Sequence, residues 1–185
     1  MQRIHLKDKE FELFIPDAEI QAAIKRMAQQ IEADMEGKNP LFVGVLNGAF
    51  MFVSDLMRAF DNAYELTFAR YSSYKGTSST GALREVMPIT TDLTGRTVIL
   101  LEDIIDTGFT MSRLMPLLRE RGAVDVRLAT MLFKPESLKV DLKPDYVGIQ
   151  IPPAFIVGHG LDYDERGRAY RDIYQVVKKT LRQRI

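Results

Sequence analysis

A polar turn between an apolar strand and an amphipathic helix is the feature that most constrains this chain. Residues 97–101 are an unbroken β-branched and aliphatic run with the length of a buried strand. Apolar residues then repeat at helical spacing over residues 109–118. The segment therefore predicts strand, turn and helix, with the turn at the carboxyl edge of a sheet. That edge is where open α/β sheets bind ligands.

The turn has the chemistry of an anion site. Gly108 is free to bring its backbone close to a ligand, and the helix N-terminus offers unpaired amides and a positive dipole end. Glu102 and Asp103 would repel a phosphate unless they bind another part of the same molecule, such as sugar hydroxyls or Mg²⁺. The alternative is that Asp106 or Thr107 simply caps the helix, but capping explains only one of the three acids.

Residues 98–110, VILLEDIIDTGFT, resemble the signature of the type I phosphoribosyltransferases. The Glu-Asp-Ile-Ile-Asp-Thr-Gly form is similar to that of the purine branch, the hypoxanthine-guanine enzymes. In this family the signature binds the ribose and 5-phosphate of phosphoribosyl pyrophosphate (PRPP). The matching positions here are Glu102, Asp103, Asp106, Thr107, Gly108, Phe109 and Thr110. Phe109 stands where many relatives carry Lys.

The resemblance also implies separate roles for the acids. Asp106 matches the catalytic carboxylate that accepts a proton near purine N7. Mg²⁺ is the implied cofactor, with Glu102 and Asp103 as its ligands and Asp162 near a second metal through water.

A second loop follows another apolar run, residues 41–46, and precedes a helical pattern over residues 50–60. Alone, its Asn47-Gly48 pair is more often just a turn. The resemblance places it where relatives bind pyrophosphate through backbone amides, often after a non-proline cis peptide. Asn47 stands where relatives often carry Lys. Arg168 matches an arginine that contacts pyrophosphate.

The implied purine site comes from later segments. A lysine after a strand is usually solvated, and an aromatic residue among apolar neighbours is usually core. The resemblance assigns Lys134 to the purine 6-oxo group and the Phe155 ring to stacking on the base. It assigns the backbone of Ile156 to the pyrimidine edge and counts Asp162 in the same site.

Residues 72–81 are small, polar and unable to bury a core. Such a loop within a domain is either a lid or disordered, and composition does not separate the two. Ser73 and Tyr74 match the start of the flexible loop that closes over the reaction centre in the family.

The whole chain fits one domain, residues 1–185, of α/β class. We expect the type I phosphoribosyltransferase fold: a central, mostly parallel sheet flanked by helices, with a core of about residues 17–160. The N- and C-terminal segments, about residues 1–15 and 150–185, would form a small hood. The chain has no cysteine, which excludes disulfides and thiolate metal sites and fits a cytoplasmic location.

These features predict transfer of a phosphoribosyl group from PRPP to a 6-oxopurine, hypoxanthine and also guanine. One alternative is a preference for xanthine. Another is a nucleotide-sensing regulator that binds nucleic acid, although 25 basic and 25 acidic residues leave no net charge to favour it. No apolar stretch reaches the length of a membrane helix, so we expect no membrane partner. The resemblance implies a homo-oligomer, a dimer or tetramer.

Overall fold

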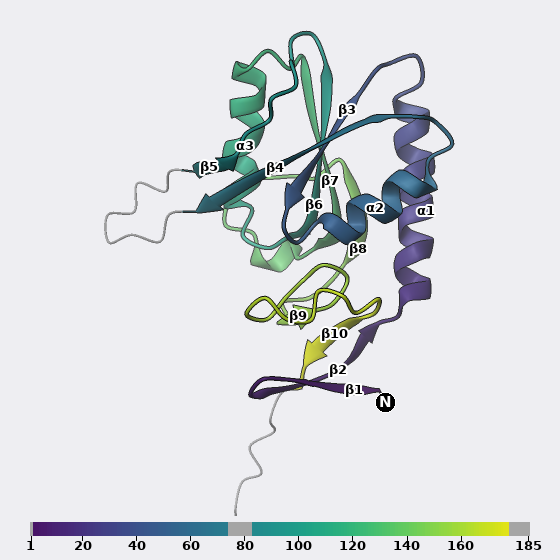
Figure 1. Ribbon diagram of the computed structural model, residues 1–185, viewed down its shortest axis with the longest axis vertical. Helices are drawn as coiled ribbons and strands as arrows, with labels where there is room; N and C mark the ends of the chain where they lie inside the picture. Colours follow the sequence, from purple (N-terminus) through teal and green to yellow (C-terminus); the bar gives the residue numbers. More distant parts are fainter. Residues whose placement is uncertain (1, 74–82, 178–185) are drawn as a thin grey trace, which may run out of the picture.

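The computed structural model describes residues 2–73 and 83–177, which form a large sheet with three helices and a smaller sheet beside it (Figure 1). The large sheet has the order β5-β4-β3-β6-β7-β8, with only β5 antiparallel to its neighbour. Its strands are β3 (Leu41–Leu46), β4 (Glu65–Ser73), β5 (Leu83–Met87), β6 (Thr97–Ile105), β7 (Asp125–Phe133) and β8 (Tyr146–Gln150). The expected α/β fold with a mostly parallel sheet is confirmed.

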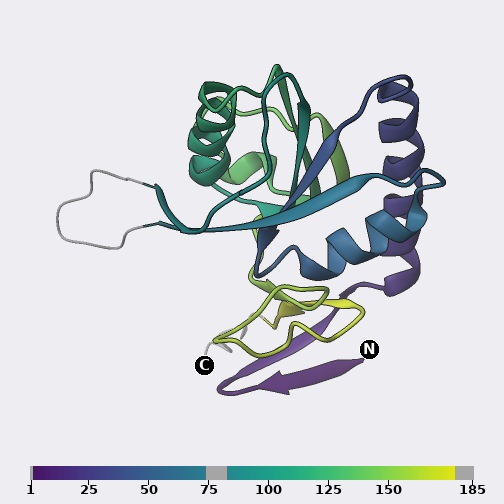
Figure 2. The same cartoon turned by 45° about the horizontal axis from the view of Figure 1, so that its top comes forward.

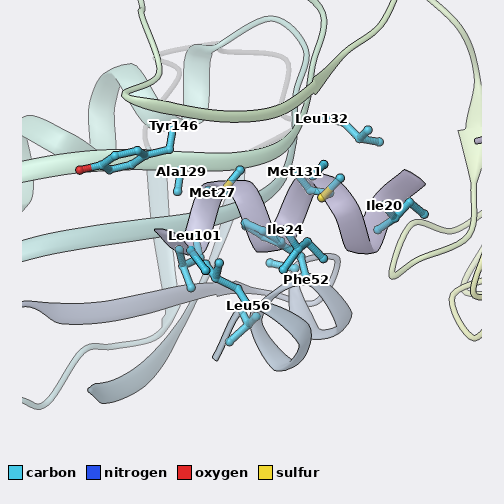
Figure 3. Close-up of a cluster of buried hydrophobic side chains, with 14 of the residues drawn as sticks. Ile20, Ile24, Met27, Phe52, Leu56, Leu101, Ala129, Met131, Leu132 and Tyr146 are labelled. Carbon is cyan, nitrogen blue, oxygen red and sulfur yellow. The ribbon is translucent and has the colours of Figure 1, made fainter. Parts of the chain in front are cut away.

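Helices cover both faces of this sheet, which is why its strands read as continuous apolar runs. Helices α1 (Asp17–Asp34) and α2 (Phe50–Ala59) pack on one face, and α3 (Phe109–Glu120) packs on the other. Figure 3 shows Ile20, Ile24 and Met27 of α1 beside Met131 of β7. Among the described residues no helix is long and apolar enough to cross a membrane.

The smaller sheet joins strands from the two ends of the chain. It has the order β1-β2-β10-β9, all antiparallel, from β1 (Arg3–Leu6), β2 (Lys9–Ile15), β9 (Ile156–Val157) and β10 (Ile173–Val176). With the connecting residues 158–172 it forms the hood, which lies at the carboxyl ends of the parallel strands (Figure 2). The hood is tied to the core at α1, where Asp172 accepts a hydrogen bond from the Asp17 amide at 2.8 Å.

Strand β6 differs from its predicted length more than either helix beside the two loops. The strand expected over residues 97–101 continues to Ile105, so Glu102 and Asp103 belong to β6 rather than to the turn. The reason is non-local, because β7 runs alongside and pairs as far as Ile105 with Phe133. A short 3₁₀ helix, Pro135–Ser137, then follows β7.

Candidate active site

The turn after β6 depends on a glycine. Gly108 has φ of +82°, in the left-handed region that other residues rarely adopt. A Cβ at this position would also press against Val140 and Leu138, at 2.8 and 3.0 Å. Gly108 is the N-cap of α3, and no side chain makes a capping hydrogen bond there. The capping alternative for Asp106 and Thr107 is therefore not what the structure shows.

The turn leaves its amides available. Within residues 2–73 and 83–177, no amide from Thr107 to Thr110 donates to a protein acceptor. These amides point out of the positive end of α3, the usual geometry of a phosphate site. The same turn lines a cavity of about 130 Å³ together with Glu102. The cavity residues are Glu102, Ile104, Ile105, Asp106, Thr107, Gly108, Phe109, Thr110 and Met111.

The ionised forms of Glu102 and Asp103 are disfavoured by their surroundings. Burial raises the pKa of Glu102 well above its ordinary value, and the neighbouring Asp103 charge raises it further. Burial also raises the pKa of Asp103 to about 6, although hydrogen bonds to the carboxylate and the charge of Arg168 act in the opposite direction. Oε2 of Glu102 is buried and has no hydrogen-bond partner among the described residues. Such a pair of acids suits an incoming cation.

The second predicted loop lies directly against this acid pair. A Cβ on Gly48 would overlap the Asp103 carboxylate, so only glycine allows the approach. The peptide bond between Leu46 and Asn47 is cis, as the family resemblance implies. Asn47 itself is exposed, immediately before Gly48.

The hood supplies the remaining predicted charges. Arg168 contacts Asp162 at 2.9 Å and Glu165 at 2.8 Å, and it donates to the Gly160 carbonyl at 2.9 Å. Because the charges of Arg168 and Asp162 both shift the pKa of Asp103, this cluster lies within electrostatic reach of β6. Residues 48, 103, 162 and 168 therefore converge, although they come from three separate segments: the loop after β3, strand β6 and the hood.

The two residues predicted to contact purine polar atoms form an ion pair. Lys134 Nζ lies 2.9 Å from Asp106 Oδ2. The lysine side chain is only 9% exposed, whereas the aspartate side chain is 49% exposed. The usual interpretation of a lysine after a strand, a solvated surface residue, is wrong here. The aspartate keeps half of its surface open to a ligand.

The residues predicted to bind the purine ring lie in and beside the two-residue strand β9. Phe155 precedes the strand and is 44% exposed, whereas the Ile156 side chain is buried in the core. The aromatic neighbours of the Phe155 ring are Phe11 and Tyr163, both in the hood. Ser73 ends β4, and Tyr74 lies outside the described residues.

A larger cavity of about 680 Å³ lies elsewhere, between α1 and α2. It is lined by residues such as Lys25, Asp55 and Arg171, and by none of the predicted site residues. Size alone therefore does not locate the site. The turn after β6, with its amides and the neighbouring buried acids, is the candidate site.

A family model for the phosphoribosyl transferase domain matches residues 17–164, which include the turn after β6, the Gly48 loop, Lys134 and Phe155 but neither end of the hood. The chain belongs to the phosphoribosyltransferase family. This finding confirms the resemblance seen in residues 98–110.

Known proteins similar to this phosphoribosyltransferase include members of the purine branch, the hypoxanthine-guanine enzymes. The hypoxanthine-guanine phosphoribosyltransferase of Bacillus subtilis is 40% identical over 157 residues, covering 84% of this chain and 87% of that protein. The bifunctional protein TilS/HprT of Listeria innocua is 42% identical over 157 residues, but the chain spans only 24% of its length. The crystal structure of a hypoxanthine-guanine phosphoribosyltransferase from Bacillus anthracis has a TM-score of 0.84 and 38% identity, covering 90% of this chain and 97% of the other.

Gly160 is a part of this phosphoribosyltransferase site that sequence reasoning missed. Its φ is +98°, and a Cβ there would overlap the Gly48 carbonyl oxygen. The hood and the Gly48 loop thus meet backbone to backbone. The available signal was the Gly-His-Gly sequence of residues 158–160, since glycine often marks a close approach of backbones. His159 between the glycines is buried, and burial lowers its pKa.

Proposed function

We propose that this protein transfers the 5-phosphoribosyl group from PRPP to a 6-oxopurine, hypoxanthine and also guanine, and releases pyrophosphate. The observation that carries the proposal is the turn after β6, which lines one cavity together with Glu102 beside the Asp106–Lys134 pair and whose amides have no acceptor among the described residues. The names of the similar proteins from B. subtilis and B. anthracis support the same activity.

The sugar phosphate would bind along the turn. The amides and hydroxyls of Thr107, Gly108 and Thr110 would hold the 5-phosphate at the N-terminus of α3. Phe109, which is 45% exposed, would border this subsite without contributing a charge. Pyrophosphate would lie against Asn47 and Gly48, with Arg168 supplying positive charge from the hood.

Mg²⁺ fits the acid pair, since Glu102 has a buried oxygen without a partner and both carboxylates lose solvation as anions. Glu102 and Asp103 would hold it, and when bound it would neutralise charge on the pyrophosphate and orient the ribose hydroxyls. No three metal-binding side chains gather in the part of the chain that the structure describes. Such a number is not required, because Mg²⁺ is usually held by one or two carboxylates plus substrate oxygens. Asp162 would act at longer range, paired with Arg168.

Asp106 and Lys134 would have different roles toward the purine. The bond from ribose C1 to pyrophosphate breaks as the bond to the base forms, and Asp106 accepts the proton that the purine loses. Lys134 donates a hydrogen bond to the 6-oxo group. The 6-amino group of adenine cannot accept such a bond. The Phe155 ring stacks on the base, and the Ile156 backbone bonds its pyrimidine edge.

We also propose that residues 1–185 work as a single domain in which the hood completes the site. The protein would act as a homo-oligomer, a dimer or tetramer, which light scattering would measure. A chain without cysteine needs no oxidising compartment, so the cytoplasm is the proposed location.

The test is pyrophosphate release with PRPP and Mg²⁺, offering hypoxanthine, guanine, xanthine and adenine in turn. We expect turnover with hypoxanthine and guanine and none with adenine. Fastest turnover with xanthine would change the substrate, and no turnover with any purine would overturn the proposal. RNA binding at physiological salt would then favour the regulator.

A further inference from the structure

The Phe155 ring is supported on two sides by other rings of the hood. The Phe11 ring lies 6.0 Å from it, between centroids, at an interplanar angle of 38°. The Tyr163 ring meets it at 5.5 Å and 90°, edge to face. Phe11 and Tyr163 also contact each other at 6.4 Å, so the three rings form a closed triangle. Phe155 remains 44% exposed, which leaves room for a further flat ring.

Tyr163 is in turn held by the turn between β1 and β2. Its hydroxyl donates to Asp8 Oδ1 at 2.6 Å, and this bond, with one from Lys9, lowers the pKa of Asp8 to about 2. Because Asp8 is therefore charged at neutral pH, the hydrogen bond is charge-assisted. The ammonium groups of Lys9 and Lys7 lie 5.1 and 5.9 Å from the centre of the Tyr163 ring.

A further contact joins the same two segments. Lys7 pairs with Asp164, the residue after Tyr163, at 2.7 Å. A single exposed ion pair contributes little, but this one adds to the contacts on the tyrosine itself. The β1–β2 turn thus fixes both the position and the orientation of the Tyr163 ring.

We propose that Tyr163 and Phe11, held by the β1–β2 turn, are positioning residues for the purine base through the Phe155 ring. The proposal rests on the proposed function, in which Phe155 stacks on the purine. A ring that is already held on two sides loses less conformational entropy when the base stacks on it, so the base binds more tightly. PRPP would bind at the turn after β6 and the Gly48 loop, and neither Phe11 nor Tyr163 is among the residues proposed to hold it.

The test compares Tyr163→Leu, which removes the ring, with Tyr163→Phe, which removes only the hydroxyl. Tyr170→Leu is the matched control, because Tyr170 belongs to the same apolar cluster of the hood but packs on Tyr174. We expect Tyr163→Leu to raise the KM for hypoxanthine by about threefold to tenfold, the value of one aromatic pair, with the KM for PRPP within about twofold. Tyr163→Phe should recover most of this loss, and Tyr170→Leu should change neither KM.

Equal rises in both KM values, or the same rise in Tyr170→Leu, would show only a loosened hood and overturn the proposal. A second measurement is independent of activity. The chain has no tryptophan, so Phe155→Trp introduces a single indole at the supported position, and it can be excited selectively over the tyrosines. We expect Tyr163→Leu to increase acrylamide quenching of this indole, and Tyr170→Leu to leave it unchanged.

The two measurements separate the two ideas. A wild-type protein that releases no pyrophosphate with any purine refutes the proposed function, while the quenching experiment still decides whether Tyr163 holds the ring at 155. An active wild-type protein with unchanged quenching and KM in Tyr163→Leu refutes the positioning role alone.

Discussion

Three acids of one short stretch occupy two contrasting environments. Glu102 and Asp103 lie within β6, where burial raises the pKa of each carboxyl. Asp106 lies past the end of the strand, half exposed, with the buried ammonium of Lys134 at 2.9 Å. Among the described residues the first pair has no lysine partner, and it suits an added cation. Asp106 has its cation already.

The difference shows that position relative to a strand end, rather than residue type, decides what each carboxylate can do. Asp106, half exposed beside the Lys134 ammonium, could accept a proton from a purine base. Two adjacent carboxylates without such a partner resist ionisation until a metal ion or another cation arrives. Three substitutions test this contrast.

The largest effect is expected at Asp106. Asp106→Asn keeps the shape of the side chain but removes the proton acceptor, so kcat with hypoxanthine should fall at least about tenfold, since general base catalysis contributes roughly 10² to 10⁴. The KM for PRPP should stay within about twofold. Steady-state kinetics would measure both, with Asp141→Asn, an exposed acid that is not among the proposed site residues, as control. An unchanged kcat would remove Asp106 from the mechanism.

An intermediate effect is expected at Lys134. Lys134→Met keeps a side chain of similar length in the buried position and removes the charge and the donor. The kcat/KM for hypoxanthine should fall about tenfold, as for the loss of a hydrogen bond to a charged group, while the affinity for adenine as a competitor should not change. Lys143→Ala, at an exposed lysine, is the control. A parallel loss for both purines would speak against recognition of the 6-oxo group.

The smallest effect concerns stability at Asp103. Because its pKa is raised from 3.8 to about 6, the folded protein holds this proton where the unfolded chain releases it. Stability from this group is therefore complete below pH 3.8 and is lost as the pH rises through 6. Asp103→Asn still offers an acceptor to the Ile104 amide and should raise the Tm above pH 6, on the order of 5 °C, without raising it near pH 4.

Thermal unfolding at several pH values would measure this gain, with Asp141→Asn as the control that should follow the wild type. A gain in Tm of the same size at pH 4 and pH 8 would show that ionisation of Asp103 is not its cause.

The sequence predicted most of the large sheet, because its strands and helices carry local periodicity. It missed the length of β6, since that is set by pairing with β7. It also missed the contacts of Gly48 with Asp103 and of Gly160 with Gly48. Those are contacts between segments far apart in the chain, and no local pattern encodes them. Strand β9, with only two residues, is too short to show any periodicity.

The site itself was predicted to different degrees. The signature residues 102–110 have a recognisable order in the chain, so their proximity follows from the sequence. The direct pairing of Lys134 with Asp106 does not follow, because it depends on how two neighbouring strands end. Similarly, Phe155 was predicted to face a ligand, but the rings behind it were not foreseen.

The hood is held by a much smaller apolar nucleus than the large sheet. Its buried cluster consists of Leu6, Phe11, Val157 and Tyr174, whereas two extensive clusters stabilise the sheet and its helices. Local opening is easiest where few apolar groups are buried, so the hood should show faster amide hydrogen exchange than β3 or β6. On heating, the hood, with its proposed contacts to the base, would then open while the sheet beside the proposed sugar-phosphate site is still folded. The stability of the hood, rather than that of the large sheet, would therefore limit how long the protein stays active.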